Sequence, residues 1–152
     1  AWRNTFRYRM LELSCNISYQ LGHVFLRSSF NNANFIARGI GHSDYAHRWQ
    51  NPGDELTTDV PAFMYPNNAL ASQFYEGSSA LVENAGQIKL RDIQLSVNLT
   101  QRPHFPLKNC RVYAYIQNVG TLWRANKKGI DPEYGRSIPE PLSTSIGFSF
   151  NL

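Results

Sequence analysis

The 152-residue sequence contains no long hydrophobic run, few charged residues and only two cysteines. No stretch approaches the roughly 18 consecutive apolar residues that indicate a membrane-spanning helix, which excludes a helical membrane protein. Residues 1–4 do not start a basic segment followed by an apolar one, so we expect no signal peptide here. Charged residues make up 17% of the chain, below the roughly 25% of an average soluble domain.

Residues that could support metal binding or catalysis are present, but their spacing does not fit either chemistry. Cys15 and Cys110 form no CxxC pair, and they could equally form a disulfide or pack as two separate thiols. His42, Asp44 and His47 lack a third His or Cys at metal-ligand spacing. The sequence also contains no G-x-S-x-G, H-E-x-x-H or P-loop motif. We therefore expect no metal, no cofactor and no enzymatic activity.

The charge and the aromatic content together indicate strands rather than a nucleic-acid-binding protein. The net charge is +4, but the 15 basic residues are scattered and form no run, so we expect no nucleic acid partner. Eight Tyr, nine Phe and three Trp occur among many Asn, Ser and Gln residues. Aromatic residues are enriched in strands, so this composition favours strands joined by polar loops.

Four segments alternate apolar and polar residues with the period of a β-strand, and a helical period fits none of them. In the last one, Ile146, Phe148 and Phe150 alternate with small polar residues. Each segment is about as long as the 9–11 residues that a tilted strand needs to cross a bilayer, whereas soluble strands average roughly five or six residues. The expected strands lie near residues 8–21, 87–100, 110–119 and 144–152.

The connections between these strands are unequal in length. The segments 27–86 and 120–143 are long, whereas 101–109 is short, as in outer-membrane barrels with long extracellular loops and short periplasmic turns. We therefore expect both long segments to be extracellular. Four strands cannot close a barrel, because the smallest closed barrels have about eight, so we expect this chain to be a fragment that pairs with strands supplied from elsewhere. The residues expected to face the lumen, or to pack against a plug within it, are Arg111, Tyr113, Tyr115 and Gln117.

Five segments resemble elements of the SusC/RagA family of TonB-linked transporters, in the same order and at similar spacing. The similarity extends over roughly the last hundred residues, with a looser likeness near residues 6–22. The five segments are RWQNPGDE (48–55, followed by Asp59-Val60-Pro61), ALVENAGQIKLRDIQLSVNLT (80–100), RVYAYIQNV (111–119), GIDPE (129–133) and the end of the chain (141–152).

This resemblance implies the fold and the partners of the protein. It implies an all-β chain that forms the C-terminal strands, about four or five, of a large plugged transmembrane antiparallel β-barrel of roughly 22 strands with long extracellular loops. The implied partners are the remainder of the barrel and its plug, a SusD-like surface lipoprotein that acts as a lid, TonB, outer-membrane lipid, and an oligosaccharide or oligopeptide substrate. The implied location is the bacterial outer membrane.

The segment 27–86 holds the residues that we expect to contact the substrate or the lid, because aromatic and polar side chains together can stack on sugars or peptides and hydrogen-bond to them. Alternatively, Trp49, Pro52 and Asp54 fold this loop back on itself, since Pro-Gly-Asp is a turn sequence. A different function is also open: a secreted β-sandwich, closed by a disulfide between the two cysteines, that binds a glycan through Trp49 and Tyr65. A hydrolase is a third, less favoured alternative. The expected contact residues are Arg48, Trp49, Asp54, Tyr65 and Tyr75.

Overall fold

The computed structural model describes residues 1–99, 108–135 and 137–151. The chain forms two compact units, of which unit 1 is Ala1–His23 with Ala85–Leu152, and unit 2 is Val24–Asn84. The expected strand ends at Thr100 and Leu152, and residues 101–107 of the expected short connection 101–109, lie outside the described residues. Residues 108 and 109 of that connection begin β6.

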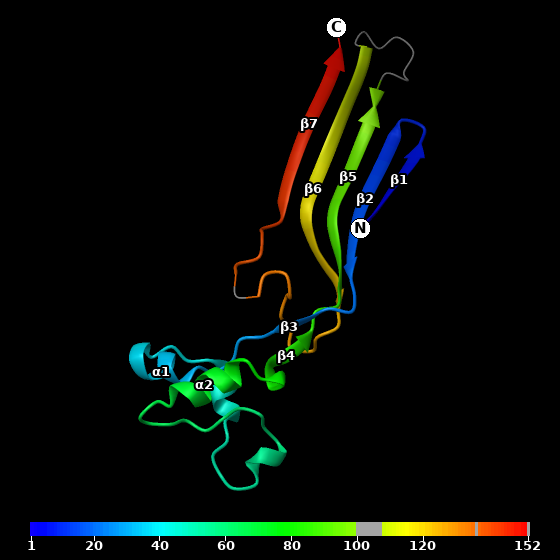
Figure 1. Ribbon diagram of the computed structural model, residues 1–152. Helices are drawn as coiled ribbons and strands as arrows, with labels where there is room; N and C mark the ends of the chain where they lie inside the picture. Colours follow the sequence, from blue (N-terminus) through cyan, green and yellow to red (C-terminus); the bar gives the residue numbers. More distant parts are fainter. Residues whose placement is uncertain (100–107, 136, 152) are drawn as a thin grey trace. The chain divides into compact units, whose positions relative to one another are not determined.

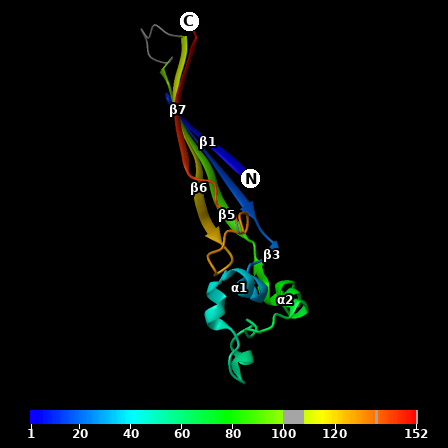
Figure 2. The same ribbon diagram turned by 90° about the vertical axis from the view of Figure 1, so that its left-hand side faces the viewer.

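Unit 1 is a single antiparallel sheet in which five strands lie in the order β1-β2-β5-β6-β7 (Figure 1). Figure 2 views these strands from the side, where β5, β6 and β7 overlap as one layer. The antiparallel all-β fold expected from the alternating segments is confirmed. The strands are β1 (Trp2–Tyr8), β2 (Leu11–Gln20), β5 (Gln87–Asn98), β6 (Lys108–Arg124) and β7 (Ser143–Asn151).

The first expected strand, near residues 8–21, corresponds to β2, and a further strand precedes it. Strand β1 pairs with β2 from Trp2 opposite Ile17 to Tyr8 opposite Leu11, so only Arg9 and Met10 form the turn. Two-residue hairpin turns usually contain Gly or Asn, and the Arg-Met sequence gives no such signal. The hairpin was therefore not readable from its turn.

Strand β6 continues to Arg124, beyond the end expected at residue 119. The expected end was too early because a bulge interrupts the alternation of apolar and polar residues there. Asp92 pairs with Gln117, but Leu90 pairs with Gly120, so two β6 residues face one β5 residue. Asn118 has a φ of 57° and Gly120 a φ of 146° in this bulge. The break in the two-residue period marks a bulge here rather than the end of the strand.

Unit 2 contains helices and a short two-stranded sheet, whereas we expected a long loop over residues 27–86. Each α-helix begins after an asparagine whose side chain accepts a hydrogen bond from the first turn, namely Asn31 for α1 and Asn68 for α2, and each is followed by a glycine. These caps were the readable signals for the helices. The elements are β3 (Val24–Leu26), α1 (Asn32–Arg38), η1 (Ser43–His47), η2 (Asp54–Leu56), α2 (Ala69–Glu76), η3 (Ser79–Leu81) and β4 (Val82–Asn84).

Unit 2 has an aromatic core of its own. The ring of Phe30, which is buried, lies 4.9 Å from the ring of Tyr45 and 5.5 Å from that of Phe35. Phe63 adds an edge contact to Phe35 at 5.8 Å. Offset and edge-on ring pairs of this kind stabilise by about 0.5–1.5 kcal/mol beyond the area they bury. Among the described residues, no helix is long and apolar enough to cross a membrane.

Candidate functional site

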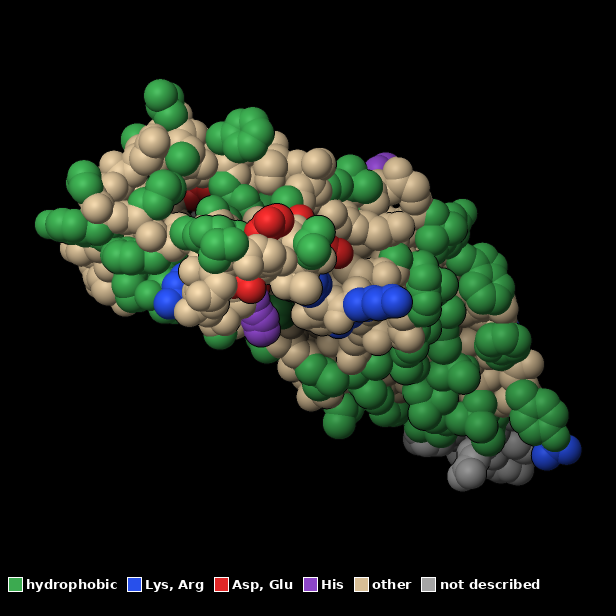
Figure 3. Space-filling view, turned by 90° about the horizontal axis from the view of Figure 1, so that it is seen from below, with side chains coloured by type: hydrophobic (Ala, Val, Ile, Leu, Met, Phe, Trp, Pro, Cys, Tyr) green, Lys and Arg blue, Asp and Glu red, His purple; other side chains and the backbone are tan. Residues whose placement is uncertain are grey.

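The register of unit 1 separates its side chains onto an apolar face and a polar face. Residues that pair directly across neighbouring strands point to the same face, and the pairs Val97–Val112 and Val112–Phe148 continue a row of apolar residues across three strands. This face is open: Ile146 is 83% exposed and Phe148 is 71% exposed. In the space-filling view of Figure 3, hydrophobic side chains cover much of the visible sheet surface.

The polar face is held together by buried and partly buried hydrogen bonds between strands. Asp92 is only 6% exposed, and its carboxylate accepts hydrogen bonds from Asn16 at 2.9 Å and from Arg3 at 3.3 Å. These three residues lie on three adjacent strands, so the contacts fix the alignment of β1, β2 and β5. The apolar side of the sheet is thus its exposed side, and charged groups are buried on the other.

A second set of hydrogen bonds joins the strands on the same polar face, further along the sheet. The guanidinium of Arg111 donates hydrogen bonds to the Glu12 carboxylate and to the Ser96 hydroxyl, both at 2.9 Å. Arg7 donates to the other oxygen of Glu12 at 2.8 Å. The four residues expected to face a lumen all lie on this polar face, since Arg111, Tyr113, Tyr115 and Gln117 pair with Ser149, Gly147, Ser145 and Ser143 of β7.

Tyr113 occupies the space above Gly147, the residue opposite it on β7. A Cβ at Gly147 would lie 2.4 Å from the ring end of Tyr113, which is closer than two such atoms can approach. The ring therefore covers a position in the strand that has no side chain. Because Gly147 has no side chain, the ring of Tyr113 fits over it on the polar face.

Gly147→Ala is expected to destabilise the protein by about 1–3 kcal/mol, because the new methyl group displaces the Tyr113 ring. The measurement is urea unfolding of the full-length protein in detergent. In a Tyr113→Ala background the same substitution should cost almost nothing. Ser145→Ala, on the same strand and face, is the control. An equal penalty for Gly147→Ala in both backgrounds would contradict the contact.

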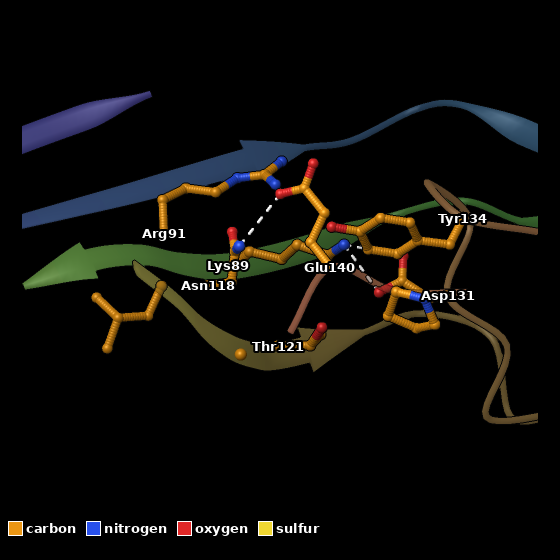
Figure 4. Close-up of a pocket in the computed structure, with 10 residues that line it drawn as sticks. Lys89, Arg91, Asn118, Thr121, Asp131, Tyr134 and Glu140 are labelled. Atoms are coloured by element: carbon orange, nitrogen blue, oxygen red, sulfur yellow. Dashed lines mark hydrogen bonds and ion pairs between the residues drawn. The ribbon is translucent and has the colours of Figure 1, made fainter. Parts of the chain in front are cut away.

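A pocket of about 180 Å³ lies at the other end of the sheet from the β1–β2 turn, where β5 and β6 meet the connection to β7. The ammonium group of Lys89 reaches Asp131 at 2.8 Å and Glu133 at 2.5 Å, and it lies 4.6 Å from the centre of the Tyr134 ring. Figure 4 shows Lys89 pointing to Asp131 beside that ring. Lys89 is only 5% exposed, so its charge is compensated inside the protein.

The same pocket has a second cation and a second anchoring contact. Arg91 donates to Glu133 at 3.0 Å, and Asn118 donates to the Glu140 carboxylate at 3.1 Å. Burial alone would raise the pKa of Glu133, but the hydrogen bonds from Arg91 and Lys89 and their positive charges lower that pKa below its ordinary value. These contacts tie Asp131, Glu133 and Glu140 of the connection between β6 and β7 to the sheet. They join Lys89 and Arg91 to Asp131 and Glu133, which lie in two of the segments that resemble the SusC/RagA family.

Three of the expected contact residues in unit 2 fold their own loop. The Asp54 carboxylate accepts hydrogen bonds from the backbone N–H groups of Gln50 and Asn51, at 3.0 Å and 2.9 Å. The Trp49 indole donates to Glu55 at 3.0 Å, and this bond is the largest cause that lowers the pKa of Glu55. Arg48 stacks over the Tyr45 ring, 4.1 Å from its centre.

The two expected tyrosine contacts differ in accessibility. Tyr75 is 8% exposed, and its hydroxyl hydrogen-bonds with that of Ser29, which in turn donates to Asp44. Burial of Asp44 alone would raise its pKa, but hydrogen bonds from Arg27 and Ser29 lower it overall. Tyr75 is thus part of the interior of unit 2. Tyr65 is 79% exposed and is the more accessible of the two.

The positions of the two cysteines and of the potential metal ligands bear on two alternatives, a sandwich closed by a disulfide and a metal site. Cys15 and Cys110 are free thiols. Cys15 pairs with Ile93, which pairs with Ile116, and Cys110 lies six residues before Ile116. At roughly 3.3 Å per residue the thiols are about 20 Å apart, too far for a disulfide. Over residues 1–99, 108–135 and 137–151, no group of three potential metal ligands occurs.

Comparison with known proteins finds chains of similar fold among solved structures. No family model and no curated protein matches the sequence. Among solved structures, the chain is similar to one described as the RagAB peptide importer in the 'open-open' state, with a TM-score of 0.51 and 21% identity. The chain has the fold of part of that importer. A second structure, of the RagAB peptide transporter, is similar at 21% identity with a TM-score of 0.49.

The similarity to RagAB extends over most of this chain but over little of the transporter. It covers 91% of this chain and 15% of the matched transporter chain in each case. The likeness to SusC/RagA transporters that the motifs indicated is thus confirmed for the fold.

Proposed function

We propose that this chain forms part of the barrel wall of an outer-membrane nutrient importer of the SusC/RagA type. The importer takes up oligopeptides or oligosaccharides and has no enzymatic activity. The RagAB neighbour, with its fold, is described as a peptide importer, which favours oligopeptides. The family-like motifs at 48–55, 80–100, 111–119 and 129–133 support the same assignment.

The observation that carries this proposal is the inverted distribution of side chains on the sheet. In water, a sheet buries its apolar face, because each exposed large apolar side chain forgoes roughly 1.5–3 kcal/mol of burial. Here Ile146 and Phe148 are exposed, whereas Asp92 and Lys89 are buried. A barrel in lipid has this arrangement, with apolar side chains outward and polar ones toward the lumen.

The edges of the sheet support a larger barrel around it. Strands β1 and β7 are the outer strands of the order β1-β2-β5-β6-β7, so one side of each has no strand partner in the described sheet. Unpaired backbone groups in hydrocarbon cost several kcal/mol each. Further strands of the barrel therefore pair with β1 and β7.

The remaining partners follow from this placement. The polar face, including Arg111 and Tyr115, faces the lumen, the plug or the passing substrate, and Phe148 faces outer-membrane lipid. Unit 2 is extracellular, where Arg48, Trp49, Asp54 and Tyr65 meet the substrate or a SusD-like lipoprotein. TonB supplies energy through the plug. A secreted sandwich is disfavoured because its disulfide would have to span about 20 Å.

The experiment compares cells that carry the intact gene with cells that carry a deletion. Uptake of fluorescent oligopeptides and of fluorescent oligosaccharides is measured in each, together with the location of the protein after membrane fractionation. We expect the protein in the outer membrane and loss of uptake of one substrate class in the deletion. Recovery of the full-length protein as a water-soluble monomer would refute the proposal.

A further inference from the structure

The apolar face of unit 1 consists of five rows of side chains that run across the strands. Residues that are direct partners in neighbouring strands share a row, and none of the residues in these rows carries a charge. We call the first the turn row, the third the middle row and the last the far row. In order from the β1–β2 turn, the rows are Tyr8, Leu11, Val97, Val112 and Phe148; Phe6, Leu13, Leu95, Ala114 and Ile146; Asn4, Cys15, Ile93, Ile116 and Thr144; Trp2, Ile17, Leu90 and Gly120; and Tyr19, Ile88 and Trp123.

Tyrosine and tryptophan occur at the two ends of this face and not in its middle row. Tyr8 lies in the turn row, Tyr19 and Trp123 lie in the far row, and Trp2 lies one row inside the far row. All four side chains are exposed. Their rings are apolar, but each has a polar O–H or N–H group, so they favour a boundary between an apolar and an aqueous layer.

A charged group follows immediately beyond the turn row. The Arg9 guanidinium lies 5.5 Å from the centre of the Tyr8 ring, at the end of the apolar face. A guanidinium over an aromatic ring retains its charge and needs access to water or to polar groups. The apolar face therefore changes to a polar environment within one residue of Tyr8.

The distance between the turn row and the far row can be estimated along β2. This strand contributes Leu11 to the turn row and Tyr19 to the far row, and the bulge beside it inserts its extra residue in β5 rather than in β2. At roughly 3.3 Å per residue the two positions are about 27 Å apart. A strand tilt of about 35–45° reduces this to a height of roughly 20 Å, and the aromatic rings extend the band at both ends, which is close to the apolar band of about 25 Å in outer-membrane barrels.

We propose that the turn row and the far row mark the two headgroup levels of the lipid bilayer around this protein. Tyr8 then lies at the headgroups of one leaflet, Tyr19 and Trp123 lie at those of the other, and the middle row contacts the ends of the acyl chains. This placement rests on the proposed function, which puts the apolar face in lipid but does not say where the bilayer begins and ends. A protein partner on this face would not require a separation that matches a bilayer.

The first test measures depth in the full-length protein reconstituted in phosphatidylcholine vesicles. Single nitroxide labels are placed through Tyr8→Cys, Trp123→Cys and Ile116→Cys, in a background that has no other cysteine. The probes are collisions with oxygen, which dissolves well in hydrocarbon, and with a water-soluble nickel chelate, which hydrocarbon excludes. We expect the ratio of oxygen to nickel collisions to be several-fold higher at Ile116 than at Tyr8 or Trp123. A label at Tyr115, next to Ile116 but on the polar face, should lack this oxygen excess.

The second test keeps the aromatic residues at the other positions and uses arginine as a probe of depth. Each arginine variant is compared with alanine at the same position, and folding into the vesicles is measured by urea titration. Ile116→Arg should lower the equilibrium constant for folding by roughly thirtyfold or more, because the cost of arginine is largest at the midplane. Trp123→Arg, on the same strand and face, should lower it less than about fivefold, because this cost falls near the headgroups.

The outcomes separate this placement from the transport proposal. Labels at Tyr8 and Trp123 that are both shallower than the label at Ile116, with unequal arginine penalties, support the placement. Equal depths or equal penalties in an inserted protein overturn the placement alone. A label at Ile116 that meets neither oxygen nor nickel indicates that protein covers this face, and this also overturns it. Labels that are all exposed to nickel overturn the placement and the proposed function together.

Discussion

Replacing Ile146 with arginine is expected to remove most of the folded protein from the outer membrane. Ile146 lies near the middle of β7 on the exposed apolar face. An arginine at the centre of the lipid-facing surface of a barrel costs about 2–4 kcal/mol. The measurement is the amount of folded protein in outer-membrane fractions, together with urea unfolding of the fraction that assembles.

The neighbouring residue supplies a matched control for this substitution. Ser145 is also exposed and lies on the same strand, but it points to the polar face opposite Tyr115. Ser145→Arg should change stability by less than about 1 kcal/mol, as expected of a lumen-side substitution. In a water-soluble protein both arginines would be tolerated alike. Equal yields of the two variants would therefore argue against a lipid-facing sheet.

The second large effect is expected from removing both acidic partners of Lys89. The double variant Asp131→Asn with Glu133→Gln leaves a 5% exposed ammonium without a carboxylate. Removing the partner of a buried charge costs about 3–5 kcal/mol. Because these contacts tie Asp131 and Glu133 of the β6–β7 connection to the sheet, the connection should detach. Tryptic cleavage after Lys127 and Lys128 should then accelerate by roughly a hundredfold or more, since about 1.4 kcal/mol corresponds to a factor of ten.

The single variants and the pH dependence test the same cluster. Asp131→Asn alone should have a smaller effect, because Glu133 remains at 2.5 Å from Lys89. Ile138→Ala, at a 91% exposed residue of the same connection, is the control. The pKa of Glu133 is lowered in the folded protein. Its contribution is therefore complete above its ordinary pKa and is lost as the pH falls through the lowered one. Cleavage that is independent of the substitutions at neutral pH would contradict this account.

The expected site residues show which structural properties can be predicted from the sequence and which cannot. Alternation placed Arg111, Tyr113, Tyr115 and Gln117 on one face correctly, because the side chains of a strand alternate whatever its partners are. The burial of Tyr75 was not readable, since it depends on Ser29, a residue far away in the sequence. The role of Lys89 was missed for the same reason, because Asp131 and Glu133 follow it by more than forty residues.

By itself, the sequence determined that the chain forms long antiparallel strands with one apolar and one polar face, since that property depends only on a two-residue period. The tertiary structure alone decided the strand order, the bulge at Asn118 and the β1 hairpin through Arg9 and Met10. It also decided which charges meet, as Arg3 meets Asp92 and Lys89 meets Asp131. These features depend on the register between distant segments, and register is set by pairing across the sheet rather than by the local order of residues.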